Sequence, residues 1–287
     1  DYSSAKKGTK VPPVRTIGGL LACTNRAGCF ERPASDPCDH WLEFQAENLG
    51  DCYLRRVRDD VLDELPPLTE VTLEVPMTAQ QGRVYRDLKK QFIAWTDSGT
   101  EIVAWNQAAQ TTDLVKCATG LELLDPDSPS SGKLDVFTEL MRERRGQSTL
   151  GLCHFRATGH AMQRRCDELG ITSRILSGAN ASKSNRRAIV DGFQAGEFEV
   201  LIGSLELVKE GLTLHRADHA IFVEHSWRPS TNEQAMRRVH RIGQERPVTV
   251  THLVTAKTVD ARMQKEIANK TDQQVRALPV HRIRQLV

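Results

Sequence analysis

The chain has 287 residues, of which 39% are hydrophobic and 26% charged, and a formal net charge of +2. This composition is typical of a globular protein with one large or two smaller domains. No segment approaches the ~20 consecutive apolar residues of a membrane-spanning helix, and no charged-then-apolar leader opens the chain. We therefore expect an intracellular, soluble protein with no membrane partner. Because the chain starts with Asp1 rather than methionine, we also expect a piece of a longer protein.

Residues 1–52 are predicted to be a loop-rich segment, because four prolines and scattered glycines interrupt any periodicity. Cys23, Cys29, Cys38 and His40 fall there within 18 residues, and thiolates with an imidazole are ligands of tetrahedral zinc. A bound zinc ion would stabilise a segment that is poor in apolar residues. The tight Cys-x-x-Cys spacing is missing, so free thiols in a loop are the alternative.

Helical and extended patterns follow this segment. We expect a helix over 53–64 that ends before two prolines. A short strand is expected over 71–75, where apolar and polar residues alternate. Two further helices are predicted at about 78–95 and 101–118. The proline- and serine-rich residues 125–132 indicate a linker.

Apolar segments alternate with helical patterns throughout residues 133–275. Such alternation indicates right-handed crossovers and an α/β fold with a doubly wound parallel sheet covered on both faces. Ligands of such sheets bind beyond the carboxyl ends of the strands, where the loops at 155–158, 177–182, 204–213 and 224–230 should gather. The expected strands are at about 149–155, 171–176, 198–203, 219–223 and 248–254, and the expected helices at about 134–145, 158–169, 182–195, 230–242 and 258–274.

The predicted helix at 230–242 concentrates arginine residues. Ser230 and Glu233 have the spacing of a capping box that would start it, and Gly243 would stop it in the left-handed conformation. Helical spacing would place two stripes side by side. The apolar stripe comprises Ala235, Val239 and Ile242, and the polar stripe Gln234, Arg238 and Arg241.

Arginine at such positions suits an anionic ligand, because the guanidinium stays charged and can form two parallel hydrogen bonds to phosphate oxygens. An arginine inserted from a neighbouring lobe can stabilise the charge that develops on a transferred γ-phosphoryl group. Arg237 is turned away from the polar stripe and is expected at the surface or facing DNA. Residues 230–287, which end in a basic tail at 276–287, hold 11 lysines and arginines against 5 acidic residues. This excess is typical of a nucleic-acid partner or, equally, of a solvated tail.

The sequence QAMRRVHRIGQ, residues 234–244, resembles the last conserved motif of the Snf-type chromatin-remodelling ATPases, a branch of the superfamily-two helicases. Further segments resemble other parts of this family in the right order. They are YLRRVRDDVLDELPP (53–67), SGKL (131–134), LCHFRATGHAMQRRCDEL (152–169), LSGANASKSNRRAIVDGFQ (176–194), IGSLELVKEGLTLHRADHAIFVEHSW (202–227) and RPVTVTHLVTAKTVDARM (246–263).

The resemblance implies a motor that couples ATP hydrolysis to movement along double-stranded DNA with two RecA-like lobes. It implies that residues 53–124 form the end of the first lobe and a helical connection. Residues 133–275 would form the carboxyl-terminal RecA-like lobe, which is the second lobe of a P-loop NTPase.

The resemblance also implies roles for individual residues. Arg241 would be the arginine finger with Arg238 as its partner, and Gln234, Gly211 and Thr213 would lie near ATP. Contacts to the DNA backbone position a protein without reading sequence. Such contacts are implied for His154, Arg156, Gly178, Arg186, Ser204, Lys209, Trp227 and Arg228.

Two parts of an ATP site are missing from the sequence. It contains no G-x-x-x-x-G-K-[ST] loop to hold phosphates, and no Asp-Glu pair follows an apolar strand to hold Mg²⁺. Gly132-Lys133 is followed by leucine and does not complete the loop pattern. We therefore expect both parts on an upstream lobe, and no ATP hydrolysis by the isolated chain.

The chain departs from the family at two places. Leu207-Val208-Lys209 stands where the family usually has Ala-Gly-Gly, and Trp227-Arg228-Pro229 where it has Trp-Asn-Pro. Because glycines allow close approach of the backbone, these changes affect the DNA contact more than the ATP chemistry. Two alternatives stay open: another superfamily-two helicase that acts on RNA or forked DNA, and a non-catalytic module that docks to nucleic acid or protein.

Overall fold

A computed structural model describes two short strands near the start of the chain and residues 65–128, 132–178, 182–209 and 211–277. The chain divides into two compact units, residues 64–267 and residues 1–63 with 268–287. In the smaller unit, β1 (Val14–Ile17) pairs antiparallel with β2 (Leu20–Cys23). No helix in the described part of the chain is long and apolar enough to cross a membrane.

The predicted zinc ligands fall almost entirely outside the described residues. Of the four, only Cys23 belongs to them, through its backbone in β2. Cys29, Cys38 and His40 lie outside, as does the helix predicted over 53–64. Within the described ranges, no group of histidine, cysteine and acidic side chains could hold a metal ion. The zinc site therefore stays a prediction.

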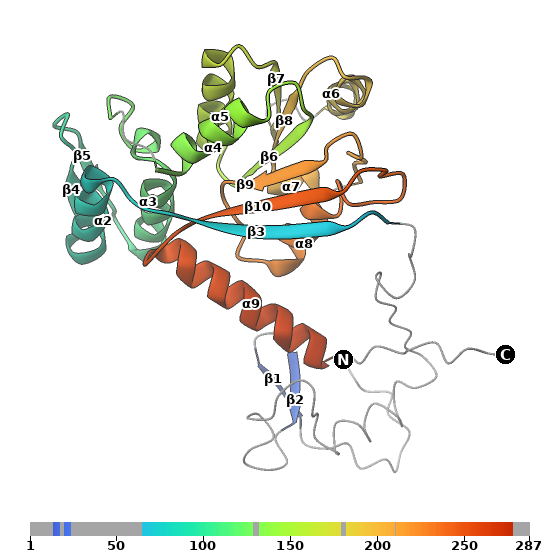
Figure 1. Ribbon diagram of the computed structural model, residues 1–287. Helices are drawn as coiled ribbons and strands as arrows, with labels where there is room; N and C mark the ends of the chain where they lie inside the picture. Colours follow the sequence, from blue (N-terminus) through green and yellow to red (C-terminus); the bar gives the residue numbers. More distant parts are fainter. Residues whose placement is uncertain are drawn as a thin grey trace, which may run out of the picture. The chain divides into compact units, whose positions relative to one another are not determined.

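The larger unit is built on a six-stranded sheet in which every pair of neighbouring strands is parallel. The order across the sheet is β3-β10-β9-β6-β8-β7 (Figure 1). The predicted parallel sheet is thus confirmed. The strands are β3 (Leu68–Val75), β6 (Thr149–Cys153), β7 (Ser173–Leu176), β8 (Val200–Ser204), β9 (His219–Phe222) and β10 (Val248–Thr255).

The edge strand β3 lies upstream of residue 133, where the lobe was expected to begin. It pairs with β10 along its whole length, from Leu68 opposite Val248 to Val75 opposite Thr255. The sheet therefore includes a strand from the region expected to connect two lobes. Alternation of apolar and polar residues predicts the strand. Its pairing partner depends on which edge of the sheet is free, and no local sequence pattern encodes that.

Helices cover both faces of the sheet, as the doubly wound prediction requires. One face carries α4 (Gly132–Glu143) and α5 (Arg156–Glu168), and the other carries α6 (Lys183–Ala195), α7 (Leu205–Val208) and α8 (Pro229–Met236). Side chains of β6 alternate between these faces, with Leu150 and Leu152 in the core on the α6–α8 side. Gly151 faces α5 so closely that an added Cβ would lie 2.5 Å from Met162 Cε.

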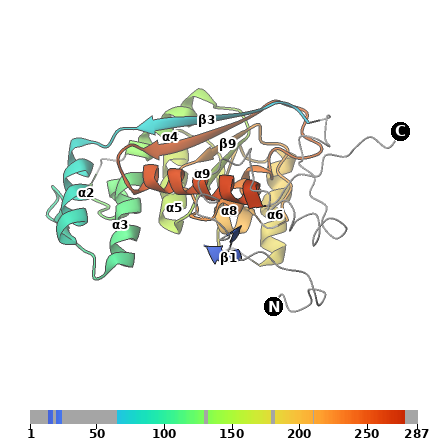
Figure 2. The same ribbon diagram turned by 90° about the horizontal axis from the view of Figure 1, so that it is seen from below.

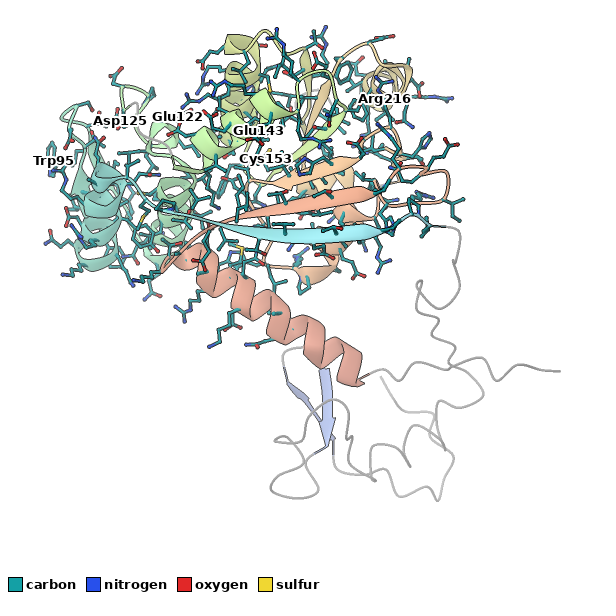
Figure 3. All side chains as sticks on the ribbon, viewed as in Figure 1. Trp95, Glu122, Asp125, Glu143, Cys153 and Arg216 are labelled. Carbon is teal, nitrogen blue, oxygen red and sulfur yellow. The ribbon has the colours of Figure 1, made fainter. Side chains whose placement is uncertain are left out.

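A small helical insert separates β3 from α4. It contains α2 (Ala79–Gln91), the hairpin of β4 (Ile93–Trp95) and β5 (Glu101–Val103), α3 (Gln107–Thr119) and the 3₁₀ turn η2 (Leu121–Leu123). Both views place α2 and α3 beyond the carboxyl end of β3 (Figures 1 and 2). Figure 3 shows Trp95 at the outer margin of the insert, where it is 59% exposed.

The helices of the insert are shorter than predicted. Thr78 caps α2 as its sequence indicates, because it accepts the N–H of Gln81 and its own N–H is accepted by the Gln81 side chain. The helix predicted to about residue 95 ends at Gln91, since Phe92 adopts the left-handed conformation with φ 61°. The helix predicted from residue 101 starts only after the hairpin, where Asn106 provides the cap.

Candidate nucleotide and nucleic-acid site

The arginine segment, which we define as residues 237–246, follows α8 without continuing it. The helix ends at Met236 and turns follow. The prediction of a helix over 230–242 is therefore wrong beyond Met236. The carbonyl of Arg238 accepts the N–H of Leu214 at 2.9 Å, whereas a continuing helix would offer it to the residue four positions on. A tertiary contact thus overrides the helical pattern.

The start of α8 also differs from the predicted capping box of Ser230–Glu233. Pro229 occupies the first turn and Arg228 the N-cap, and no side chain caps the helix there. Asn232 stabilises the preceding turn instead. Its Oδ1 accepts the N–H of Ser226 at 2.8 Å, and its Nδ2 donates to the Ser226 carbonyl at 2.9 Å. Proline at the first helical position and this amide bridge replace the predicted cap.

The two predicted stripes of this helix are only partly formed. Ala235 and Val239 are buried, but Ile242 is 67% exposed because it lies past the end of the helix. Gln234 is exposed on α8. Gly243 adopts the left-handed conformation with φ 95°, although it ends a turn rather than a helix. The burial of Val239 still anchors the arginine segment to the core.

Arg238 and Arg241 both reach the chain segment before Thr213. Nη2 of Arg238 donates to the carbonyl of Lys209, and Nη1 of Arg241 donates to the carbonyl of Leu212 at 3.5 Å. Burial, followed by the positive charge of Arg241, lowers the pKa of Arg238. In the part of the chain that the structure describes, Nε of Arg238 is buried without a hydrogen-bond partner. Such an unsatisfied donor next to a second guanidinium suits an anion.

Arg237 pairs with an acidic side chain of α8 at the surface, one of the two places that its position in the sequence predicts. Its Nε donates to Oε1 of Glu233 at 3.0 Å, one helical turn earlier. The side chain is 39% exposed. Arg237 is therefore a surface residue with an ion-pair partner, and it offers a natural comparison for its two neighbours.

Gly211 and Thr213 line a shallow hollow of about 360 Å³ on the side of the sheet that carries α6. Gly211 adopts the left-handed conformation with φ 62°. The hollow brings together Arg186 on α6 with Gly211 and Thr213, three residues singled out from the sequence. The remaining lining residues are Arg187, Val190, Asp191, Gln194, Leu212 and His215. Arg241 adjoins the hollow through its bond to the Leu212 carbonyl.

Other predicted nucleic-acid residues follow the carboxyl ends of the parallel strands. His154 and Arg156 come after β6, and Ser204 ends β8 and forms the N-cap of α7. Gly178 follows β7 and is exposed. Trp227 and Arg228 are exposed after β9, and Arg228 is the N-cap of α8.

Lys209, a predicted DNA contact, already has an acidic partner. Its ammonium forms an ion pair with Glu206, three residues earlier. The pKa of Glu206 is lowered by its hydrogen bond with Lys209, and further by the charges of Lys209, Arg228 and His154. An acidic side chain thus lies among three residues expected to meet phosphates, and the sequence analysis had not singled it out.

Glu224 is a second residue that sequence reasoning missed. It is 1% exposed, and Oε2 accepts the N–H groups of His154 and Phe155 at 2.8 and 2.9 Å. Oε1 accepts the hydroxyls of Thr158 at 2.7 Å and Thr119 at 3.1 Å. The carboxylate therefore fixes the loop that carries His154 and Arg156, at the start of α5, where a negative charge is favoured. An acid placed directly after an apolar strand is the signal that could have found it.

Lys133 is buried and has no access to a ligand. Its side chain is 0% exposed, and Nζ donates to the carbonyl of Val223 at 3.0 Å and forms an ion pair with Asp260 at the start of α9 (Val259–Ala277). The lysine of the Gly132-Lys133 pair is thus structural. This placement agrees with the sequence argument that the pair is not a phosphate loop.

These features define the class of the fold. A parallel sheet with helices on both faces, which carries candidate residues after the carboxyl ends of its strands, is a doubly wound α/β fold, the class to which RecA-like lobes belong. The C-terminal part of the Fun30 ATPase domain, known from a crystal structure, superposes with a TM-score of 0.56. At 16% identity, the match covers 71% of this chain and 89% of that one. This likeness shows the fold.

The sequence comparisons then give the family. Residues 132–243 match the family described as the helicase conserved C-terminal domain. Over 232 residues the chain is 30% identical to the "Putative ATP-dependent helicase/translocase YwqA" of Bacillus subtilis, a match that covers 76% of this chain and 25% of YwqA. It is 34% identical to the chromatin-remodeling ATPase INO80 of Mycosarcoma maydis over 152 residues, 52% of this chain and 8% of that protein. The chain belongs to the Snf2-type branch of the superfamily-two helicases and contains their C-terminal domain.

The chain spans a quarter or less of the length of these two relatives. The names of the relatives describe whole proteins, which are an ATP-dependent helicase/translocase and a chromatin-remodeling ATPase. The activities of those whole proteins are not carried over to this chain, and its function is inferred from its own residues.

Proposed function

We propose that this chain is the carboxyl-terminal motor lobe of an ATP-dependent translocase that moves along double-stranded DNA. Arg241 would be the arginine finger that reaches ATP bound to an upstream lobe, and Arg238 its partner. The observation that carries the proposal is the pair of guanidiniums beside the segment 209–212, one of them with a buried, unsatisfied N–H. Two positive charges held together disfavour each other, and a nucleotide phosphate between the lobes would relieve that cost.

This lobe would supply part of a binding site for ATP with Mg²⁺. Arg238 and Arg241 would contact the phosphates, while Gly211, Thr213 and the exposed Gln234 would border the nucleotide or the facing lobe. The phosphate loop and the acid that holds Mg²⁺ would belong to the upstream lobe, because Lys133 is buried in an ion pair. Bound Mg-ATP would supply the phosphoryl group, and the arginines would stabilise the charge that develops on it.

The DNA contacts would lie after the strands and along α6. His154, Arg156, Gly178, Arg186 and Ser204 would bind backbone phosphates, together with Lys209, Trp227 and Arg228. Contacts of this kind are independent of sequence, which suits a motor that must pass over every base pair. Their support is their common position after the carboxyl ends of the strands or beside the α6 hollow.

The finger is tested by Arg241→Ala in the protein that also carries the upstream lobe. Turnover of ATP at saturating double-stranded DNA should fall by roughly 10³-fold. The dissociation constant for ATP should change little, because the upstream lobe would provide most of the binding. Arg237→Ala is the matched control, since its guanidinium pairs with Glu233 at the surface. An unchanged turnover in Arg241→Ala would remove the assigned role.

The nucleic-acid partner is tested by comparing stimulation of the ATPase by double-stranded DNA, forked DNA and RNA. Double-stranded DNA should stimulate best. Stronger stimulation by RNA or forked DNA would favour another superfamily-two helicase. This chain alone should hydrolyse no ATP. If the longer protein lacks a phosphate loop and a Mg²⁺-binding acid, the chain would instead be a docking module.

A further inference from the structure

Gln244 is a buried amide at the end of the arginine segment, and its contacts converge on the wall of the α6 hollow. The side chain is 6% exposed. Its Nε2 lies 2.9 Å from the carbonyl of His215, 2.8 Å from that of Ala217 and 3.3 Å from that of Val239. Its Oε1 accepts the N–H of Arg246 at 3.0 Å. One carboxamide thus joins the arginine segment to the chain that follows Thr213.

The arginine segment needs such an anchor because it is not helical. A helix would fix the direction of Arg238 and Arg241 through its own hydrogen bonds, but α8 ends before both. Val239 anchors the segment in the core, yet an apolar contact is non-directional. Direction must therefore come from hydrogen bonds. The amide of Gln244 has acceptors in residues 215–217 and in the arginine segment, and the N–H of Arg246 in the same segment donates to it.

A second link runs in parallel with this one. The N–H of Leu214 donates to the carbonyl of Arg238 at 2.9 Å, and the N–H of Gln244 donates to the carbonyl of Arg241 at 2.9 Å. The peptides of both arginines are therefore tied, directly or through Gln244, to residues 214–217. Those residues continue from Gly211 and Thr213 on the hollow. Hydrogen bonds consequently join the backbone of the two arginines to the backbone that continues from the hollow.

We propose that Gln244 is a positioning residue that holds Arg238 and Arg241 in register with the wall formed by residues 211–217. The inference rests on the proposed function of the arginine pair. Gln244 itself touches no ligand, because its amide is used up by backbone groups. It acts by fixing the peptides that carry the guanidiniums, and a displacement of about 1 Å at such groups can cost about 10²-fold in rate.

The perturbation is Gln244→Glu, which keeps the size and the acceptor for Arg246 but sets a carboxylate oxygen against the carbonyls of His215 and Ala217. Gln244→Met, of similar length and without charge, is the second variant should the first fail to fold. The matched control is Gln81→Glu in the insert. Gln81 is also buried, and its Nε2 donates to the Cys117 carbonyl at 3.0 Å.

Amide hydrogen exchange in this chain tests the anchor without any assumption about activity. Gln244→Glu should accelerate exchange at the N–H groups of Leu214 and Gln244, which tie the peptides of the two arginines to residues 214–217, directly or through Gln244. Gln81→Glu keeps the oxygen that accepts the N–H groups of Thr78 and Gly132, and it should leave exchange at Leu214 and Gln244 unchanged. Unchanged exchange at both amides in Gln244→Glu would overturn the proposal.

Kinetics in the protein with the upstream lobe test whether the anchor acts through the finger. Gln244→Glu should lower kcat by about 10²-fold with the KM for ATP nearly unchanged, whereas Gln81→Glu should leave the kcat of the folded protein unchanged. In an Arg241→Ala background, Gln244→Glu should cause a much smaller further loss, because residues that act as a unit are not additive. An equal loss in both backgrounds would mean a general structural role and would contradict the proposal.

The two proposals can fail separately. If Arg241→Ala leaves turnover unchanged, the finger assignment fails, and with it the catalytic consequence drawn for Gln244. Exchange in this chain would still decide whether Gln244 fixes the arginine segment. If Arg241→Ala is inactive while Gln244→Glu keeps full turnover, the finger stands and Gln244 is not its positioning residue.

Discussion

Replacing Lys133 by methionine should destabilise the lobe more than any surface substitution. The lysine is 0% exposed and pairs with Asp260, which is itself 5% exposed. Removing one partner of a buried ion pair leaves the other charge without compensation, which costs about 3–5 kcal/mol. The carbonyl of Val223 also loses the donor that lies 3.0 Å away. For a unit of this size, a loss of 3–5 kcal/mol lowers the melting temperature by roughly 6–20 °C.

Thermal and urea unfolding of the chain, followed by circular dichroism, would measure this loss. Lys133→Met/Asp260→Asn should recover most of it, because a buried pair replaced as a whole is often close to neutral. Arg142→Met is the matched control, since its ion pair with Glu139 is exposed on the same helix. It should leave the melting temperature unchanged. A Lys133→Met variant as stable as the wild type would refute the assignment of a buried pair that joins α4 to α9.

Three further results are expected. Glu224→Gln should lower the free energy of unfolding by roughly 3 kcal/mol, because an amide cannot accept all four of the bonds that the carboxylate accepts. Urea denaturation would measure this loss, and an equally stable variant would contradict the role of Glu224. Glu206→Gln should free Lys209 for a phosphate, so that DNA affinity rises and the slope of log affinity against log salt concentration steepens by about 1. An unchanged slope in fluorescence titrations at several salt concentrations would argue against Lys209 as a contact. Burial and the charge of Arg144 lower the pKa of His219 to about 4. Between pH 4 and about 6.5 the unfolded chain therefore binds a proton at His219 that the folded chain does not, and stability should fall as the pH drops through this range. His219→Gln should weaken this pH dependence of the melting temperature, and equal pH profiles in the two proteins would contradict the prediction.

The fold could be predicted from the sequence where single elements carry their own signal. The strands β6 and β9 are buried along their whole length, and an uninterrupted apolar run between helical patterns predicts such strands in a parallel sheet. The cap of α2 was also readable, because Thr78 and Gln81 bond to each other. In both cases the physical cause lies within a few residues of chain.

The sequence predicted less well where distant contacts decide. The helix over 230–242 had a capping box and two stripes. Pro229 and the Asn232–Ser226 bridge form its start instead of the capping box, and it ends at Met236, before the Leu214–Arg238 bond. The partners Lys133 and Asp260 are far apart in the chain, so no periodicity can join them. The hairpin after α2 has strands of three residues, too short for alternation to separate them from a helix.

The candidate site shows the same division. The family resemblance assigned Arg238 and Arg241 to ATP hydrolysis, Gly211 and Thr213 to the nucleotide and Arg186 to DNA. The structure gathers these five residues around one hollow and the segment beside it. The residues that hold this group in place were not visible, because they are common amides and acids bonded to backbone. A family pattern indicates which side chains meet a ligand, whereas only coordinates indicate which ones support them.

The ratio of ATP turnover between Arg241→Ala and Arg237→Ala tests the central claim most directly. Both variants remove one guanidinium from the same segment, and they would be compared in the protein with its upstream lobe at saturating double-stranded DNA. The account predicts that Arg241→Ala is slower by roughly 10³-fold while both variants bind ATP with similar dissociation constants. Equal turnover in the two variants would contradict the claim that this lobe completes an ATP site.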